Sequence, residues 1–224
     1  MLPAPADVAA VFQHDPMPAR LDSPDKILHQ DPFVYQWDDW LPQEQIQDIL
    51  EKQTHAVEYT LGKTKSRSLH HVTDRRRCWN HIITPDDASS LTLLEQQAAD
   101  FLGVSSDHFE PGVLLRYGFD EYFRPHLDTN RQTWQGEQSK RVATLLVYLN
   151  DDYQGGHTCF PLLGLNTEPR RGRAIYWRYD HSDTRKNDLL LHSGEPVRSG
   201  VKHAVCLFLR DRPFVGAQRG RMSY

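Results

Sequence analysis

The pattern of hydrophobic and polar positions divides the chain near Gly103. Ahead of it, residues 41–54 and 86–101 carry apolar side chains every three or four positions, which predicts two amphipathic helices. Glycine commonly follows the last turn of a helix, so the second helix is expected to end at Gly103. A short apolar run at residues 33–37 predicts a strand in front of the first helix.

Beyond Gly103 the pattern changes to short apolar runs separated by turn-forming glycine, asparagine, aspartate and serine. These runs lie at residues 113–117, 122–126, 142–149, 157–160, 173–177, 189–192 and 203–209. Short strands at such spacing predict an antiparallel barrel or a double-sheet jelly roll. The two helices would pack on one sheet and cover its outer face. The predicted fold class is therefore α+β and mainly β, a double-stranded β-helix (jelly roll) with N-terminal supporting helices.

The same pattern predicts one domain with a peripheral segment at each end. Residues 1–30 contain five prolines and no sustained periodicity, which predicts a loosely ordered N-terminal arm. Residues 31–214 form the predicted domain, whose core lies at 110–213. Residues 215–224 are polar and contain glycine, which predicts a C-terminal tail.

Composition narrows the class of protein. Lys and Arg number 26 against 30 Asp and Glu, a net charge of −4, so nucleic acid is not an expected partner. The longest apolar run, residues 142–149, is far shorter than the roughly 20 residues that cross a bilayer, and no membrane partner is expected. The N-terminus shows no basic segment followed by an apolar one, so we expect a cytoplasmic protein. Nothing in the sequence indicates an oligomeric state.

The first candidate for chemistry is a metal site. His126 and Asp128 are two positions apart at a predicted strand, so their side chains point to one face. His192 lies at the end of another predicted strand. Two histidines and a carboxylate are the facial ligands of non-heme Fe(II) oxygenases, which leave positions open for a chelating co-substrate and O2. Because His-x-Asp also occurs by chance, this spacing alone is weak, and the three isolated cysteines add no ligand motif.

The second candidate is Lys202, an isolated cation at the start of an apolar strand, ten positions after His192. A lysine that points into a barrel carries an unpaired charge unless an anion meets it. A dicarboxylate bound to the metal at one end would place its far carboxylate against this cation. The alternative is a lysine at a strand end whose ammonium reaches solvent. In that case Arg210 is the next candidate to bind the carboxylate.

A resemblance to a known family connects these residues. Residues 114–128 read Tyr117, a glycine-containing stretch, Tyr122 and then Pro-His-x-Asp, and this block resembles the prolyl 4-hydroxylase family of 2-oxoglutarate/Fe(II) dioxygenases. Further blocks follow in family order at residues 141–150, 155–161, 171–175 and 191–203. The resemblance is strong over residues 110–213 and weak over 31–45.

The resemblance implies a cofactor set and its ligands. Fe(II) would be bound by His126, Asp128 and His192. The co-substrate 2-oxoglutarate would be bound by Lys202, with help from Tyr117 and Thr158. O2 is the second co-substrate, and ascorbate is a candidate reductant. The family supplies no catalytic side chain beyond the metal ligands.

The activity implied is hydroxylation of an unactivated C–H bond, with succinate and CO2 as co-products. By resemblance the substrate is a prolyl residue in a peptide or protein; a free amino acid or small metabolite is the alternative. Asp128 stands where related halogenases carry a small residue, which favours hydroxylation over halogenation. In a different class, the chain would be a catalytically inactive jelly-roll metal-binding module. Retention of the three ligands and Lys202 argues against that reading.

Residues that depart from the family pattern are candidates for substrate contacts. His203 follows the lysine where the family usually has Trp, and His157 stands where it often has Glu. The polar loop at 129–140 contains Trp134 and would overhang the iron, either as a closing lid or as a simple connector. The basic stretch at 61–77 is either a solvated loop or a rim that binds an acidic or polypeptide substrate.

Overall fold

The computed structural model of the chain describes residues 24–60, 68–83, 87, 89–129, 140–180 and 184–214. Its strands are β1 (Lys26–His29), β2 (Val34–Trp37), β3 (Ser68–Val72), β4 (Arg76–Ile82), β5 (Val113–Tyr117), β6 (Tyr122–His126), β7 (Arg141–Tyr148), β8 (Gln154–Gly155), β9 (Thr158–Phe160), β10 (Leu165–Thr167), β11 (Ala174–Arg178), β12 (His192–Gly194), β13 (Val197–Ser199) and β14 (Lys202–Arg210). The α-helices are α2 (Gln43–Thr60), α3 (Ser89–Leu102) and α4 (Thr184–Asp188), and single 3-10 turns lie at Ser106–His108 and Pro161–Leu163.

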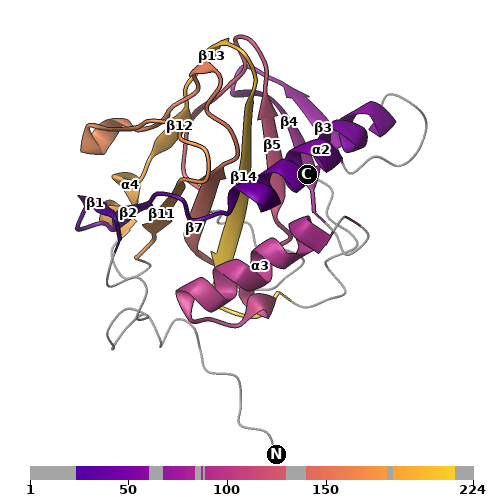
Figure 1. The fold of residues 1–224 in the computed structure, drawn as a ribbon. Coiled ribbons are helices and arrows are strands. Elements are labelled where there is room, and N and C mark those ends of the chain that lie inside the picture. Colours follow the sequence, from indigo (N-terminus) through magenta and orange to yellow (C-terminus); the bar gives the residue numbers. More distant parts are fainter. Residues whose placement is uncertain are drawn as a thin grey trace, which may run out of the picture.

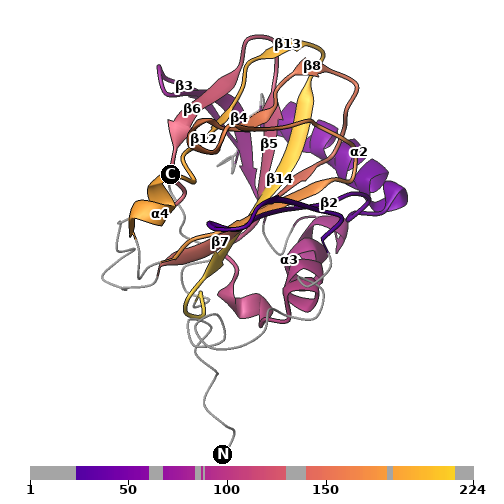
Figure 2. The same ribbon diagram turned by 90° about the vertical axis from the view of Figure 1, so that its left-hand side faces the viewer.

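Twelve of these strands form one antiparallel sheet, which curves until it is nearly closed (Figures 1 and 2). The strand order is β1-β2-β11-β7-β14-β5-β4-β6-β12-β9-β10, with β3 paired to β4. Strands β8 and β13 form a separate two-stranded pair. Many neighbours in this order are far apart in the sequence, as is usual for double-sheet jelly rolls. The predicted fold class is confirmed.

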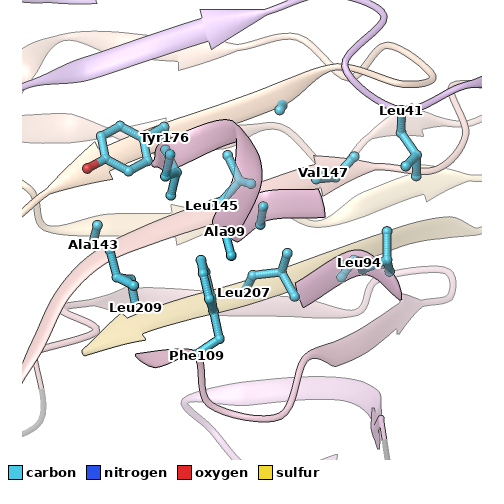
Figure 3. Close-up of a cluster of buried hydrophobic side chains, with 14 of the residues drawn as sticks. Leu41, Leu94, Ala99, Phe109, Ala143, Leu145, Val147, Tyr176, Leu207 and Leu209 are labelled. Atoms are coloured by element: carbon cyan, nitrogen blue, oxygen red, sulfur yellow. The ribbon is translucent and has the colours of Figure 1, made fainter. Parts of the chain in front are cut away.

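Alternation along the strands separates two hydrophobic cores. On β14, Val205 and Leu207 belong to the core beneath the helices, whereas Ala204 and Cys206 belong to the core inside the sheet. Figure 3 shows the first of these cores, where strand side chains pack against Leu94 of α3. Each strand therefore contributes one face to packing against the helices and the other to the interior.

Helices α2 and α3 cover the outer face of the sheet, as predicted (Figure 1). Ile46 and Ile49 of α2 and Leu94 of α3 have no exposed surface. None of the helices in the described residues is long and apolar enough to cross a membrane.

Besides the short strands β8, β10 and β13, which were not predicted, the structure differs from the predicted elements in three places. Strand β1 lies within the segment expected to be a loose arm; of that segment, residues 1–23 lie outside the described residues, as does the predicted tail. Strands β3 and β4 form a hairpin where a polar loop was one of the two readings. The strand predicted at 189–192 is wrong: α4 ends at Asp188, a turn follows it, and the strand starts only at His192. Most side chains of β3 and β4 are polar, so these segments lack the alternation of apolar and polar residues that predicts a strand.

Candidate metal centre and cavity

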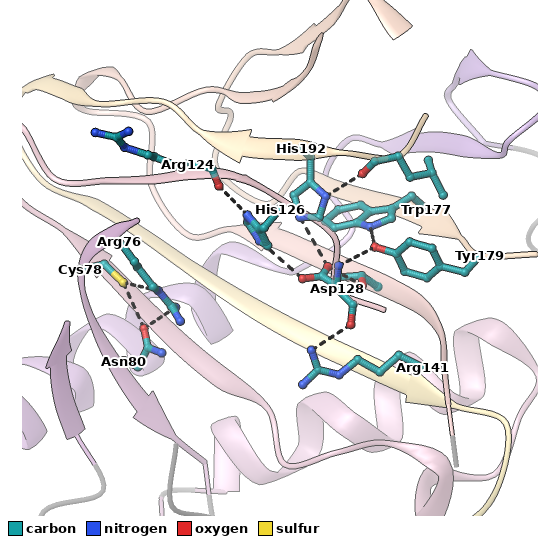
Figure 4. A network of polar contacts seen from close by, with 12 residues as sticks. Arg76, Cys78, Asn80, Arg124, His126, Asp128, Arg141, Trp177, Tyr179 and His192 are labelled. Atoms are coloured by element: carbon teal, nitrogen blue, oxygen red, sulfur yellow. Dashed lines mark hydrogen bonds and ion pairs between the residues drawn. The ribbon is translucent and has the colours of Figure 1, made fainter. Parts of the chain in front are cut away.

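Three predicted metal ligands lie together inside the jelly roll. His126 ends β6 and His192 begins β12, and these two residues are directly opposite each other in the pairing of the two strands. Asp128 follows two positions later and lies between them (Figure 4). Its Oδ1 is 3.6 Å from His126 Nε2 and its Oδ2 is 3.5 Å from His192 Nε2. The ligand atoms of all three lie within 4.8 Å of one another, close enough to share one metal ion.

Hydrogen bonds orient both imidazoles toward this point. His126 Nδ1 lies 2.9 Å from the carbonyl oxygen of Arg124, and His192 Nδ1 lies 2.9 Å from that of Leu190. A carbonyl oxygen only accepts, so each Nδ1 carries the proton and each Nε2 presents its lone pair to the centre. The residues therefore fit Fe(II), whose non-heme oxygenase sites use this donor set.

Electrostatics favour the protonation states that metal binding requires. Burial alone would raise the pKa of Asp128, but His192, His126 and Arg141 outweigh it and hold the pKa well below its usual range. Burial lowers the pKa of His192 to about 4. The aspartate is thus ionised and the histidine neutral near pH 7.

A layer of hydrogen bonds around the ligands fixes Asp128. Thr144 Oγ1 donates to Oδ2 of Asp128 at 2.9 Å. The Tyr179 hydroxyl accepts from the Asp128 amide at 3.2 Å and from the Trp177 indole at 2.8 Å. Arg141 donates to the Asp128 carbonyl at 3.3 Å. These residues were missed from the sequence, although Thr144, a polar residue within an apolar run, was a usable signal.

Thr144→Val is expected to weaken metal binding by about tenfold, the lower end of the usual effect of mutating a residue that hydrogen-bonds to a metal ligand. The valine keeps the shape but removes the proton that orients Oδ2 of Asp128, whereas Thr144→Ser keeps it. Titration with Co(II), followed by its visible spectrum, gives the affinity without turnover. Equal affinity in the wild type and Thr144→Val would contradict this role.

Lys202 faces the same cavity, which has a volume of about 310 Å³. Only 3% of its surface is exposed, so the alternative in which its ammonium reaches solvent is wrong. Its Nζ donates to the Gly156 carbonyl at 2.6 Å and lies 5.3 Å and 5.1 Å from the ring centroids of Tyr117 and Tyr148. None of the ion pairs among the described residues includes it. Burial lowers the pKa of Lys202 to about 7, which a bound anion would reverse.

Gly156 makes this lysine position possible. Its φ is +65°, and a Cβ there would lie 2.8 Å from the Tyr153 ring and 3.2 Å from Lys202 Cδ. A side chain at this position would displace the lysine stem and strain the backbone. The glycine pair before Thr158 is therefore structurally required.

Tyr117 and Thr158 also line the cavity beside Lys202. Tyr117 lies opposite Lys202 in the pairing of β5 with β14. The Tyr148 hydroxyl donates to Thr158 Oγ1 at 2.7 Å, which leaves the Thr158 proton to be donated to another acceptor, such as a carboxylate. Tyr148 was not predicted, because its role depends on the fold rather than on a motif.

The other sequence-predicted residues are placed elsewhere. His203 and His157 are half-buried and are not among the described residues that line the cavity. Burial lowers the pKa of His203 to about 4. Arg210 donates to Glu110 at 2.6 Å and is not needed as a substitute for Lys202. Trp134 lies outside the described residues.

Two residues of the predicted basic rim are part of the site. Arg75 and Arg76 both line the cavity.

A jelly roll that brings two histidines, a carboxylate and a buried lysine into one cavity has the architecture of the 2-oxoglutarate/Fe(II) oxygenases. Residues 112–210 match the family model described as the 2OG-Fe(II) oxygenase superfamily. This part of the chain is thus similar to that superfamily, and the comparisons with curated relatives confirm the resemblance to the prolyl 4-hydroxylase family.

Two curated relatives and one solved structure show the extent of the similarity. Prolyl 4-hydroxylase 1 of Arabidopsis thaliana is 29% identical over 133 residues, covering 53% of this chain and 47% of that protein. A putative prolyl 4-hydroxylase of Acanthamoeba polyphaga mimivirus is 30% identical over 118 residues, covering 50% and 49%. The chain therefore spans about half the length of these relatives. The viral collagen prolyl hydroxylase of Paramecium bursaria Chlorella virus-1, in its 2-oxoglutarate complex, shares the fold, with a TM-score of 0.60, 23% identity and coverage of 79% and 95%.

Proposed function

We propose that this chain is a 2-oxoglutarate- and Fe(II)-dependent dioxygenase that hydroxylates a prolyl residue in a peptide or protein. The observation that carries the proposal is the buried Lys202 ammonium, which lies in the same cavity as the three metal ligands and has no carboxylate partner among the described residues. A metal site alone would not require a buried ammonium. A dicarboxylate bound to the metal at one end would require a cation at its other end, which Lys202 supplies. Peptide or protein is favoured because the relatives are named prolyl 4-hydroxylases and one structural neighbour was solved with a peptide fragment.

The residues of the chain would divide the work as follows. His126, Asp128 and His192 would hold Fe(II), and Lys202 with Tyr117 and Thr158 would hold the far carboxylate of 2-oxoglutarate. The bound iron and co-substrate supply the oxidising chemistry, in which one oxygen atom of O2 enters succinate, the other enters the C–H bond, and CO2 leaves. Apolar walls such as Leu115, Leu146 and Phe208 would limit the entry of water.

Addition of Fe(II) and then 2-oxoglutarate to the apoprotein without oxygen is expected to give a weak visible charge-transfer band that requires both components. Prolyl peptides should then perturb the band, and under air succinate and hydroxyproline should form in equal amounts. Absence of the band in folded protein with fresh iron would overturn the oxygenase proposal. Only perturbation by free amino acids, without a peptide response, would favour the small-substrate alternative.

A further inference from the structure

Besides Lys202, the cations Arg75, Arg76 and Arg141 line the cavity, and Arg76 has no part in the proposed chemistry. Arg76 begins β4, and its Nε lies 2.9 Å from Cys78 Sγ while its Nη2 donates to Asn80 Oδ1 at 2.7 Å (Figure 4). No ion pair among the described residues includes it. Arg141, another cation lining the cavity, forms a two-bonded pair with Glu110 at 2.7 Å and 2.6 Å.

The guanidinium of Arg76 packs on the ring of Phe123, which in turn packs on the imidazole of the metal ligand His126. Its guanidinium carbon lies 4.4 Å from the ring centroid of Phe123, which is directly opposite Arg76 in the pairing of β4 with β6. The Phe123 ring in turn stacks on the His126 imidazole at 3.5 Å between centroids. Arg76 therefore lines the same cavity as the three metal ligands and is separated from His126 by one aromatic ring.

The sum of the charges in the loaded cavity indicates which kind of group Arg76 binds. Fe(II), ionised Asp128, doubly charged 2-oxoglutarate and protonated Lys202 sum to zero. Arg76 is not part of this balance and is only partly exposed. Removing a cation even partly from water is costly unless an anion pairs with it. Nε and one N–H of Nη2 already have partners, so both N–H groups of Nη1 and the second N–H of Nη2 can donate to an incoming group.

We propose that Arg76 binds a carboxylate of the substrate, so that the substrate carries an acidic group close to the carbon that is hydroxylated. This rests on the proposed function and narrows its substrate class. The carboxylate is either an acidic side chain next to the target residue or the terminal carboxylate of the target itself. Arginine suits this task because its planar donors match carboxylate geometry.

Two pairs of acetylated prolyl peptides test the proposal. In one pair an aspartate after the proline is replaced by asparagine, and in the other the proline's terminal carboxylate is replaced by an amide. Calorimetry with Fe(II) and 2-oxoglutarate, without oxygen, should show that the wild type binds the acidic member of one pair at least about tenfold more tightly. Arg76→Met should lose this preference while its affinity for the neutral peptides stays within about twofold. Which pair responds identifies the source of the carboxylate.

Arg77→Met is the matched control, because Arg77 is the next residue on β4 but is exposed and does not line the cavity; its guanidinium carbon lies 5.8 Å from the ring centroid of Tyr122. It should keep the preference. If Arg76→Met is poorly folded by thermal unfolding, Arg76→Lys takes its place and should keep a weaker preference for the acidic peptide.

Two results would overturn the proposal. One is a wild-type protein with no preference for the acidic member of either pair. The other is an Arg76→Met variant whose 2-oxoglutarate affinity falls about tenfold, which would assign Arg76 to the co-substrate instead. Failure of the proposed function is distinct, because the wild type would then show no charge-transfer band with iron and 2-oxoglutarate.

Discussion

Asp128→Ala is expected to abolish turnover and to weaken metal binding by more than about a hundredfold, since changes outside the ligand set alone cost ~10–100-fold. Asp128 supplies the single carboxylate of the site, and it is held ionised between two histidines. Without it, only the two imidazoles remain, which neither balance the metal charge nor complete a facial set. Co(II) titration measures the affinity, and succinate release from 2-oxoglutarate measures turnover.

Asp100→Ala is the matched control for this prediction. Asp100 is exposed on α3, where it accepts a hydrogen bond from Gln96 in the same helix. The same loss of a carboxylate there should leave both measurements unchanged. A Co(II) affinity in Asp128→Ala within about threefold of the wild type would refute the ligand assignment. Asp128→Gly offers an extension: binding of chloride beside the metal would show that the carboxylate decides between hydroxylation and halogenation.

The part of the site that the sequence predicted is the part defined by local spacing. Strands β5 and β6 have the predicted bounds, because the apolar pattern and the flanking turns are both sharp there. The two-residue separation of His126 and Asp128 predicts one shared face in a strand; in the structure β6 ends at His126, and Asp128 meets His126 just beyond the strand end. The position of His192 opposite His126, by contrast, depends on how β12 pairs with β6, and no local pattern contains this register.

The part that was missed consists of polar residues inside the fold. Arg76 belongs to the basic stretch that the sequence offered as a rim, but its partners Cys78 and Asn80 on β4 were missed, because polar side chains that face a cavity give the same pattern as a solvated loop. The contact of Thr144 with Asp128 likewise joins residues on different strands. Such contacts follow from tertiary packing, so the sequence alone could suggest the residues but not their partners.

Lys202→Ala is expected to weaken 2-oxoglutarate binding by about a hundredfold, because it removes a desolvated cation that would form a charge-assisted hydrogen bond to the far carboxylate. Co(II) affinity should not change, since Lys202 is not among the metal ligands. Calorimetric titration of 2-oxoglutarate into metal-loaded protein without oxygen measures the effect. Lys140→Ala, a change at an exposed lysine, is the control and should leave the affinity unaltered.

The pH dependence of the same titration distinguishes a charge effect from a simple loss of packing. Burial lowers the pKa of Lys202 to about 7 in the ligand-free protein, and the co-substrate carboxylate would raise it again. Binding therefore takes up a proton, and its free energy is fully favourable only below the ligand-free pKa. As the pH rises from 7 toward 9, the affinity of the wild type should fall by up to about tenfold per pH unit. Lys202→Ala should show no such slope; an equal slope in both proteins would mean that another group titrates.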